Sequence, residues 1–155
     1  MQTTSKDTQF TQLIDDELPK LRGIAFRILN NADDADDAVQ EALFKAYMRF
    51  DSFKSKAALS SWVCRIVVNC AYDIFRKRRR EAEGLKDYDP TRQTADTAAL
   101  EDAIADLPEI YRDAIVIGVL SGLDGKAAAQ ELGISTNTLY QRIFKAKQML
   151  KNVLK

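Results

Sequence analysis

Residues 125–142 read GKAAAQELGISTNTLYQR, and this stretch decides the fold of the C-terminal part of the chain. It places a small residue at Ala129, a glycine at Gly133 and apolar residues at Ile134 and Leu139. Ala129 allows two helices to approach closely, and Gly133 tolerates the left-handed conformation of a turn between them. The spacing therefore predicts a helix-turn-helix.

The second helix of this motif is predicted to have one apolar and one polar side. The apolar side carries Leu139, Ile143, Ala146 and Leu150. The opposite side offers hydroxyl, amide and cationic groups at Thr136, Asn137, Tyr140, Gln141, Arg142 and Lys145. Such groups can reach base edges and phosphates in the major groove of duplex DNA. An ordinary helical hairpin with a solvated polar side is the alternative, because this spacing also occurs in other proteins.

The chain before this motif predicts further helices and no strands. Apolar stripes with a period near 3.6 indicate helices over residues 10–30 and 35–50. Ser60 or Ser61 can cap a third helix that continues to about Arg80. The sequence therefore predicts an all-α fold.

A polar segment divides the predicted helices into two units. Residues 81–96 lack apolar periodicity and include Gly84 and Pro90, so they are predicted to form a flexible linker. We expect two small helical domains, at residues 8–80 and 97–155. Caps or first-turn residues of the C-terminal helices are predicted at Thr97, Pro108, Asp124 and Ser135.

The composition argues against several classes of function. No apolar run approaches the roughly 20 residues that cross a bilayer, and the first ten residues are polar. We therefore expect a soluble cytoplasmic protein without membrane insertion. The chain has no histidine, and Cys64 and Cys70 would point roughly 120° apart on a helix. A disulfide, a zinc site and histidine-dependent catalysis are thus not expected, and we predict no catalytic residue, metal or cofactor.

Charge is balanced overall but unevenly distributed. The 23 basic and 23 acidic residues give a net charge of zero, so no global argument for nucleic-acid binding is available. Basic residues concentrate in residues 63–80 and 116–155, and acidic residues predominate in residues 81–115 between them. This pattern indicates two separate basic surfaces.

The predicted third helix carries one of these surfaces. Its polar residues recur at steps of four and three, within a stripe roughly 80° wide: Arg65, Asn69, Tyr72, Arg76 and Arg79. The other side is apolar, with Val63, Ile66, Val67, Cys70 and Ile74. Cations for phosphates, together with an aromatic ring and an amide for unpaired bases, suit single-stranded DNA. Alternatively Trp62, at the edge of the stripe, is a core residue and residues 76–80 are a solvated helix end.

A third surface is predicted on the helix over residues 35–50. The acidic cluster before it lacks the glycine and terminal glutamate of a calcium-binding loop, so we predict no metal there. The helix leaves an acidic face with an aromatic residue beside it, formed by Asp36, Asp37, Gln40, Glu41 and Phe44. A solvated surface is the default interpretation, and binding of a basic protein partner is the more specific hypothesis.

Taken together, these motifs resemble the extracytoplasmic function (ECF) group of the sigma-70 family, group IV, whose members contain little more than regions 2 and 4. The resemblance covers about Leu18 to Leu150. Region 2 is matched by DADDAVQEALFKAY at residues 34–47 and by SSWVCRIVVNCAYDIFRKRRR at residues 60–80. Region 4 is matched by LPEIYRDAIVIGVLSGL at residues 107–123 and by TLYQRIFKAKQML at residues 138–150.

The resemblance implies a sigma factor that binds RNA polymerase core and promoter DNA and is a monomer when free. It implies that the acidic face docks on the β′ clamp helices and that region 4 docks on the β flap. The melted minus-ten element would be held by the stripe together with Lys54, Lys56, Ser60, Ser61 and Trp62. The minus-thirty-five element would be read by the outer residues of the last helix together with Ser135 and Thr138. An anti-sigma protein is a further implied partner.

Two other functions fit parts of the pattern. A helix-turn-helix regulator would form a dimer on palindromic duplex DNA, with the first unit as a dimerisation or sensor module. A helical adaptor that does not bind DNA would leave Arg76, Arg79 and Lys145 dispensable. Under the sigma-factor hypothesis the polymerase performs the chemistry, while this chain captures unpaired bases and binds DNA only weakly on its own.

Overall fold

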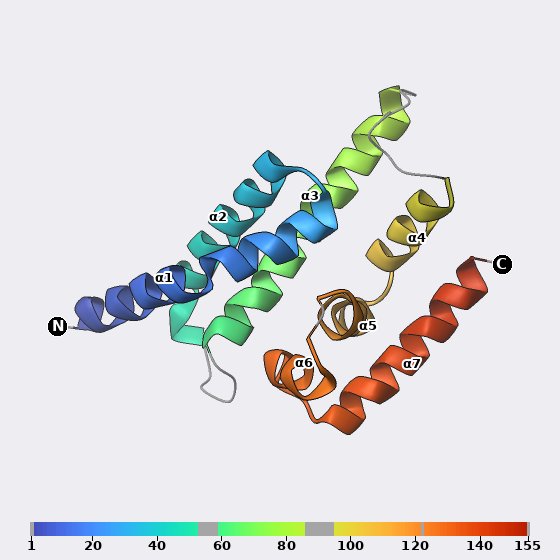
Figure 1. Cartoon of the computed structure of the whole chain (residues 1–155). Helices are drawn as coiled ribbons and strands as arrows, with labels where there is room; N and C mark the ends of the chain where they lie inside the picture. Colours follow the sequence, from blue (N-terminus) through green and yellow to red (C-terminus); the bar gives the residue numbers. More distant parts are fainter. Residues whose placement is uncertain (1, 53–58, 86–94, 122, 155) are drawn as a thin grey trace. The chain divides into compact units, whose positions relative to one another are not determined.

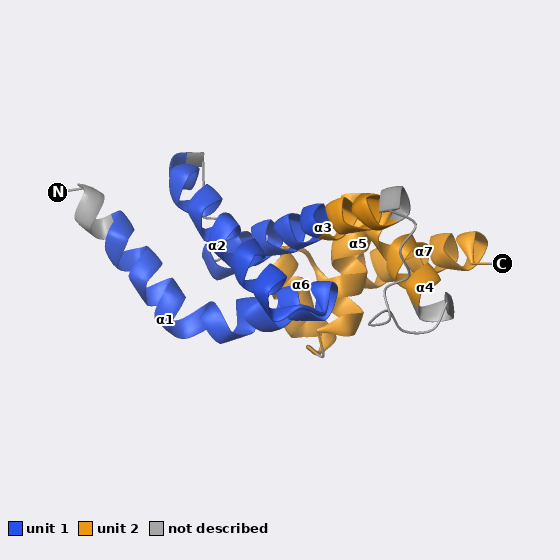
Figure 2. Cartoon of the chain, turned by 90° about the horizontal axis from the view of Figure 1, so that it is seen from above, with its two compact units in different colours: residues 1–74 blue, residues 75–155 orange. Residues whose placement is uncertain are grey.

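The computed structural model of the chain describes residues 2–52, 59–85, 95–121 and 123–154 (Figure 1). Within these ranges it contains seven α-helices, one 3-10 turn and one π-helix, and no strand. This confirms the predicted all-α fold. Contacts between residues divide the chain into two compact units, residues 1–74 and residues 75–155 (Figure 2). The division falls inside a helix, before the predicted end of the first domain at residue 80.

Unit 1 is built on a close pair of helices, α1 (Gln2–Leu29) and α2 (Ala32–Met48). The buried side of α2 consists largely of alanines, at Ala35, Ala38, Ala42 and Ala46. Such small side chains let two helices approach closely. Asn30 joins the helices with a left-handed φ of 51°, and the Asn31 side chain accepts a 2.9 Å hydrogen bond from the Asp34 backbone N–H. Two asparagines therefore form the turn, one as left-handed residue and one as helix cap.

The N-terminal half of α1 also contributes to the core of unit 1. Figure 2 shows α1 bent near its middle, and Pro19, which cannot donate a backbone hydrogen bond, lies inside the helix. Before Pro19, the Phe10 ring packs edge-on against Tyr47 and Phe50, with centroid distances of 5.3 and 5.7 Å. The Phe50 ring belongs to the short 3-10 turn η1 (Phe50–Ser52) that follows α2.

Helix α3 (Leu59–Leu85) differs from the prediction at both described ends. Ser60 and Ser61 lie inside the helix, so the prediction that one of them caps it is wrong. The helix also continues past Arg80 into the predicted linker. Helix-forming residues follow there, and an ion pair of 3.6 Å between Arg78 and Glu81, three residues apart, supports the extra turn.

The two cysteines of α3 are buried thiols. Burial raises the pKa of the Cys70 thiol, and the Lys45 ammonium group nearby on α2 partly opposes this effect. A raised pKa disfavours the reactive thiolate, so Cys70 has the properties of a small core residue.

Unit 2 contains the end of α3 and the helices α4 (Ala95–Ala105), α5 (Glu109–Ile115), α6 (Gly125–Leu132) and α7 (Thr136–Val153), with the π-helix η2 (Val116–Leu120) after α5. Helix α7 packs against α4, α5 and α6. The predicted cap Thr97 lies inside α4, and Pro108 directly precedes α5. Gly118 in η2 lies close to α7, where an added Cβ atom would be 2.9 Å from Ile143 Cδ1. The glycine thus permits the close packing of these two elements.

The structure confirms the predicted helix-turn-helix in α6 and α7. Asp124 caps α6 by accepting a 2.8 Å hydrogen bond from the Ala127 backbone N–H. Gly133 ends α6 with a left-handed φ of 68°. Ser135 caps α7, its hydroxyl accepting a 3.1 Å hydrogen bond from the Thr138 backbone N–H. These cap and turn residues fix where each helix begins and ends.

The described helices include none whose length and apolar content would suit a path through a lipid bilayer.

Candidate nucleic-acid and partner interfaces

Helix α2 exposes the acidic face predicted from the sequence. We call it the α2 face: Asp36, Asp37, Gln40, Glu41 and Phe44. Phe44 keeps 67% of its surface exposed, although it is a large apolar residue. Met48, which the sequence pattern did not single out, is 64% exposed and lies one helical turn beyond Phe44. Two adjacent exposed apolar side chains on an acidic helix surface are suited to a protein partner.

Two carboxylates of the α2 face form ion pairs with neighbouring cations. Asp36 Oδ1 lies 2.9 Å from Arg22 Nε of α1, and Glu41 Oε1 lies 3.1 Å from Lys45 Nζ. The hydrogen bond to Glu41 raises the pKa of Lys45. Both pairs are partly exposed, so a basic partner can compete for the carboxylates.

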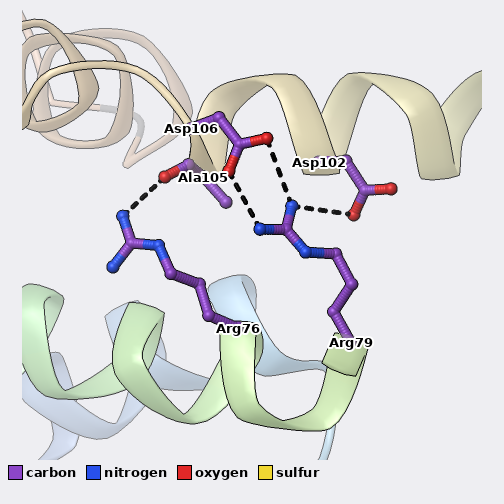
Figure 3. A network of polar contacts seen from close by, with 5 residues as sticks. All are labelled: Arg76, Arg79, Asp102, Ala105 and Asp106. Atoms are coloured by element: carbon purple, nitrogen blue, oxygen red, sulfur yellow. Dashed lines mark hydrogen bonds and ion pairs between the residues drawn. The ribbon is translucent and has the colours of Figure 1, made fainter. Parts of the chain in front are cut away.

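The predicted stripe on α3 is only partly accessible. We call it the α3 stripe: Arg65, Asn69, Tyr72, Arg76 and Arg79. Arg65 is exposed and Asn69 is half-buried, so both side chains are at least partly accessible. Tyr72 is only 4% exposed, so the prediction that its ring offers a stacking surface is wrong in this conformation. The remaining two residues, Arg76 and Arg79, point toward α4 (Figure 3).

The burial of Tyr72 follows from the wide buried surface of α3. Besides the residues predicted as apolar, Cys64, Val68 and Ala71 are buried. With 100° per residue, the buried arc from Cys70 to Tyr72 spans roughly 200°. Tyr72 lies at the edge of this arc, because small side chains extend the packed surface beyond the apolar stripe.

The other residues predicted to hold the minus-ten element have different environments. Ser61 is 4% exposed, so the prediction that its side chain contacts DNA is wrong in this conformation. Ser60 and Trp62 are half-buried. Lys54 and Lys56 lie outside the described residues.

Arg76 and Arg79 contact the C-terminal end of α4 (Figure 3). Arg76 Nη2 donates a 2.6 Å hydrogen bond to the Ala105 carbonyl oxygen. Arg79 Nη2 lies 2.9 Å from Asp106 Oδ1, and Arg79 Nη1 lies 3.6 Å from Asp102 Oδ1. The Asp106 carboxylate raises the pKa of Arg79 above its already high ordinary value. The linear sequence contains no signal for these contacts, because the acidic residues lie in and directly after another helix.

Helix α7 presents the predicted polar surface to solvent. We call it the α7 outer face: Ser135, Thr136, Asn137, Thr138, Tyr140, Gln141, Arg142 and Lys145. Most of these side chains are exposed, and Thr138 and Arg142 are half-buried. The buried Leu139, Ala146 and Leu150 anchor the opposite side of the helix. Phe144, which is 65% exposed one turn after Tyr140, also lies on this face and was missed by the sequence analysis.

Two residues of the α7 outer face have defined neighbours within unit 2. A Cβ atom added to Gly125 would overlap the Tyr140 hydroxyl and lie 2.9 Å from Tyr140 Cζ. The absence of a side chain at Gly125 therefore makes room for the Tyr140 ring at the start of α6. Lys145 Nζ lies 5.4 Å from the centre of the Tyr111 ring, within the range of a cation–π interaction.

The helix-turn-helix of unit 2 and the α2 face of unit 1 together define the class of protein. A capped helix-turn-helix with an exposed polar second helix is the architecture of a duplex DNA-binding module, and unit 1 adds a separate surface suited to a protein partner.

Comparison with known proteins identifies the family within that class. The protein-family model for Sigma-70 region 2 matches residues 13–81, and the family model for Sigma-70, region 4 matches residues 97–150. The ECF RNA polymerase sigma factor EcfG of Rhodopseudomonas palustris is 35% identical over 145 residues, covering 88% of this chain and 80% of the relative. SigM of Mycobacterium tuberculosis is 32% identical, covering 94% and 76%. This chain belongs to the ECF RNA polymerase sigma factors, which favours the sigma-factor hypothesis over the dimeric regulator.

Solved structures of two other proteins are similar to this chain in sequence and fold. The sigma factor RpoE of Bartonella quintana, solved with the anti-sigma factor NepR, has a TM-score of 0.54 and 28% identity and covers 94% of this chain and 96% of its own. CnrH, solved with the cytosolic domain of CnrY, has a TM-score of 0.55 and 25% identity, with coverages of 96% and 88%.

Proposed function

We propose that this sigma factor joins RNA polymerase core through the α2 face and holds promoter DNA through α3 and α7. The observation that carries the proposal is the exposed α7 outer face on a capped helix-turn-helix, because it combines base-reading and phosphate-binding groups on an anchored helix. The α2 face binds the β′ clamp helices, and unit 2 binds the β flap.

In this proposal the two DNA surfaces have different substrates. The α7 outer face reads the minus-thirty-five element as duplex, and Phe144 adds an apolar group that can contact a thymine methyl. Arg65, Asn69 and the half-buried Trp62 contact the melted minus-ten strand, whose bases are unpaired. Tyr72 and Ser61 have no part in this contact.

Partners and location complete the proposal. RpoE was solved in complex with the anti-sigma factor NepR and CnrH in complex with the cytosolic domain of CnrY, which supports an anti-sigma partner for this chain as well. Such a partner would cover polymerase-binding surfaces such as the α2 face. We further propose that the free chain is a cytoplasmic monomer.

Run-off transcription with core polymerase tests the minus-ten surface. Arg65→Ala and Asn69→Ala are each expected to lower the transcript yield from a duplex promoter about fivefold, since each removes one polar contact worth roughly 1 kcal/mol. A template melted in advance over the minus-ten element should restore the yield, because strand capture no longer limits opening. Arg27→Ala, an exposed arginine of α1, is the control. Equal losses on both templates would show that these residues act elsewhere than in strand capture.

Gly125→Ala tests whether the position of Tyr140 matters for promoter reading. The added methyl group displaces the Tyr140 ring, which is 57% exposed and can turn into solvent, so the free energy of unfolding should change by less than about 1 kcal/mol. Transcription from a duplex promoter should fall by the same factor as in Tyr140→Ala. Gly23→Ala is the matched control, because an added Cβ on this helical glycine meets nothing within 4 Å. Full activity of Gly125→Ala beside an impaired Tyr140→Ala would contradict this positioning role.

A further inference from the structure

The basic end of α3 is bound by acidic and carbonyl groups of α4 within unit 2. Arg79 approaches Asp106 with both terminal nitrogens, at 2.9 and 3.4 Å, and Asp102 lies 3.6 Å from one of them. Arg76 donates to the Ala105 carbonyl oxygen one turn earlier (Figure 3). The two arginines of the α3 stripe thus converge on one end of one helix.

This end of α4 resembles a phosphate group, because it presents negative charge and hydrogen-bond acceptors to the two arginines. Ala105 is the last residue of α4, where backbone carbonyls have no partner within the helix and the helix dipole is negative. The carboxylates of Asp102 and Asp106 add two formal negative charges beside it. Arginine binds carboxylate and phosphate through the same pair of parallel N–H donors. A DNA phosphate and the Asp106 carboxylate therefore compete for the same edge of the Arg79 guanidinium.

We propose that the end of α4 is an autoinhibitory latch, in which Asp102, Asp106 and the Ala105 carbonyl hold Arg76 and Arg79 away from DNA in the free protein. The inference rests on the proposed function of helix α3 in holding promoter DNA. Release of the latch on polymerase would add both arginines to the minus-ten surface. The free chain would accordingly bind single-stranded DNA more weakly than its basic residues allow.

The exposure of the partners makes the latch reversible. The Arg79 side chain is 19% exposed, whereas those of Asp106 and Asp102 are 61% and 35% exposed. Each ion pair with solvent access shifts an equilibrium by roughly fivefold at most, so several phosphates presented in a row can displace the two pairs. Lys77, Arg78 and Arg80 of the same basic run are exposed. They provide a first contact for DNA while the latch is closed.

Neutralising the latch carboxylates in the full chain tests the proposal. The variant Asp102→Asn/Asp106→Asn is expected to bind a fluorescein-labelled single-stranded oligonucleotide about three- to tenfold more tightly than the wild type, without polymerase and at low salt. The slope of log affinity against log salt should steepen by about 0.7 for each phosphate gained. Asp15→Asn/Asp16→Asn removes the same charge from exposed positions of α1 and is the matched control. Circular dichroism checks that all variants keep their helical content.

Adding Arg79→Gln separates the latch from the DNA-binding role. If the latch holds Arg79, this third change returns the tighter oligonucleotide binding of Asp102→Asn/Asp106→Asn most of the way to the wild-type level. Binding no tighter than that of the α1 control would overturn the latch and leave the DNA-binding role untouched. That role is tested by the single variant Arg79→Gln in run-off transcription with polymerase, where undiminished yield from a duplex promoter would overturn it.

Discussion

Phe44→Ala is expected to fold as well as the wild type and to bind RNA polymerase core about thirtyfold more weakly. Phe44 is 67% exposed, so its truncation removes little packing from unit 1. In the proposed complex the ring is buried at the centre of the α2 face, and a central aromatic anchor contributes about 2 kcal/mol or more to binding. The affinity can be measured by fluorescence anisotropy of the labelled full chain titrated with core polymerase.

Phe26→Ala is the matched control for this prediction. Phe26 is also an exposed phenylalanine, with 46% of its surface accessible, but it lies on α1 outside the α2 face. Its loss should leave the affinity for polymerase within about twofold of the wild type. If both variants bind equally well, polymerase docks on another surface. If both bind equally weakly, general apolar character rather than the α2 face accounts for the contact.

Local rules predicted the helix-turn-helix accurately. Gly133 has the left-handed φ that its position required, and Asp124 and Ser135 accept the capping hydrogen bonds expected of them. These features depend on residues no more than four apart, so the linear pattern contains the information. The exposure of the α7 outer face follows from the same periodicity, since Leu139 fixes which side of the helix is buried.

Contacts between distant segments account for what the sequence could not predict. The periodicity of α3 placed Tyr72 in a polar stripe, but the width of the buried arc depends on the small residues that allow neighbouring segments to approach. Likewise, the partners of Arg79 are Asp102 in α4 and Asp106 directly after it, both more than twenty residues away. A pattern within one helix shows which residues share a side, and it does not show what covers that side.

A buried charged pair in α5 is a further feature that no local pattern indicates. Arg112 Nη2 lies 3.2 Å from Asp113 Oδ1, and both side chains are 4% exposed. Charged residues are rarely buried to this extent unless they are paired. Because α5 packs against α7, the pair lies in the part of unit 2 that supports α7.

Arg112→Leu is therefore expected to destabilise the protein by about 3–5 kcal/mol, because it leaves the Asp113 carboxylate buried without this cation. Urea unfolding of the full chain, followed by circular dichroism, measures the loss. The double variant Arg112→Leu/Asp113→Leu removes both charges and should recover most of it, since an apolar pair no longer carries the desolvation cost of a buried charge. A double variant as unstable as the single one would show that the loss comes from packing rather than from an uncompensated charge. In that case the shape of these two side chains, and not their charge, would stabilise α5 and its packing against α7.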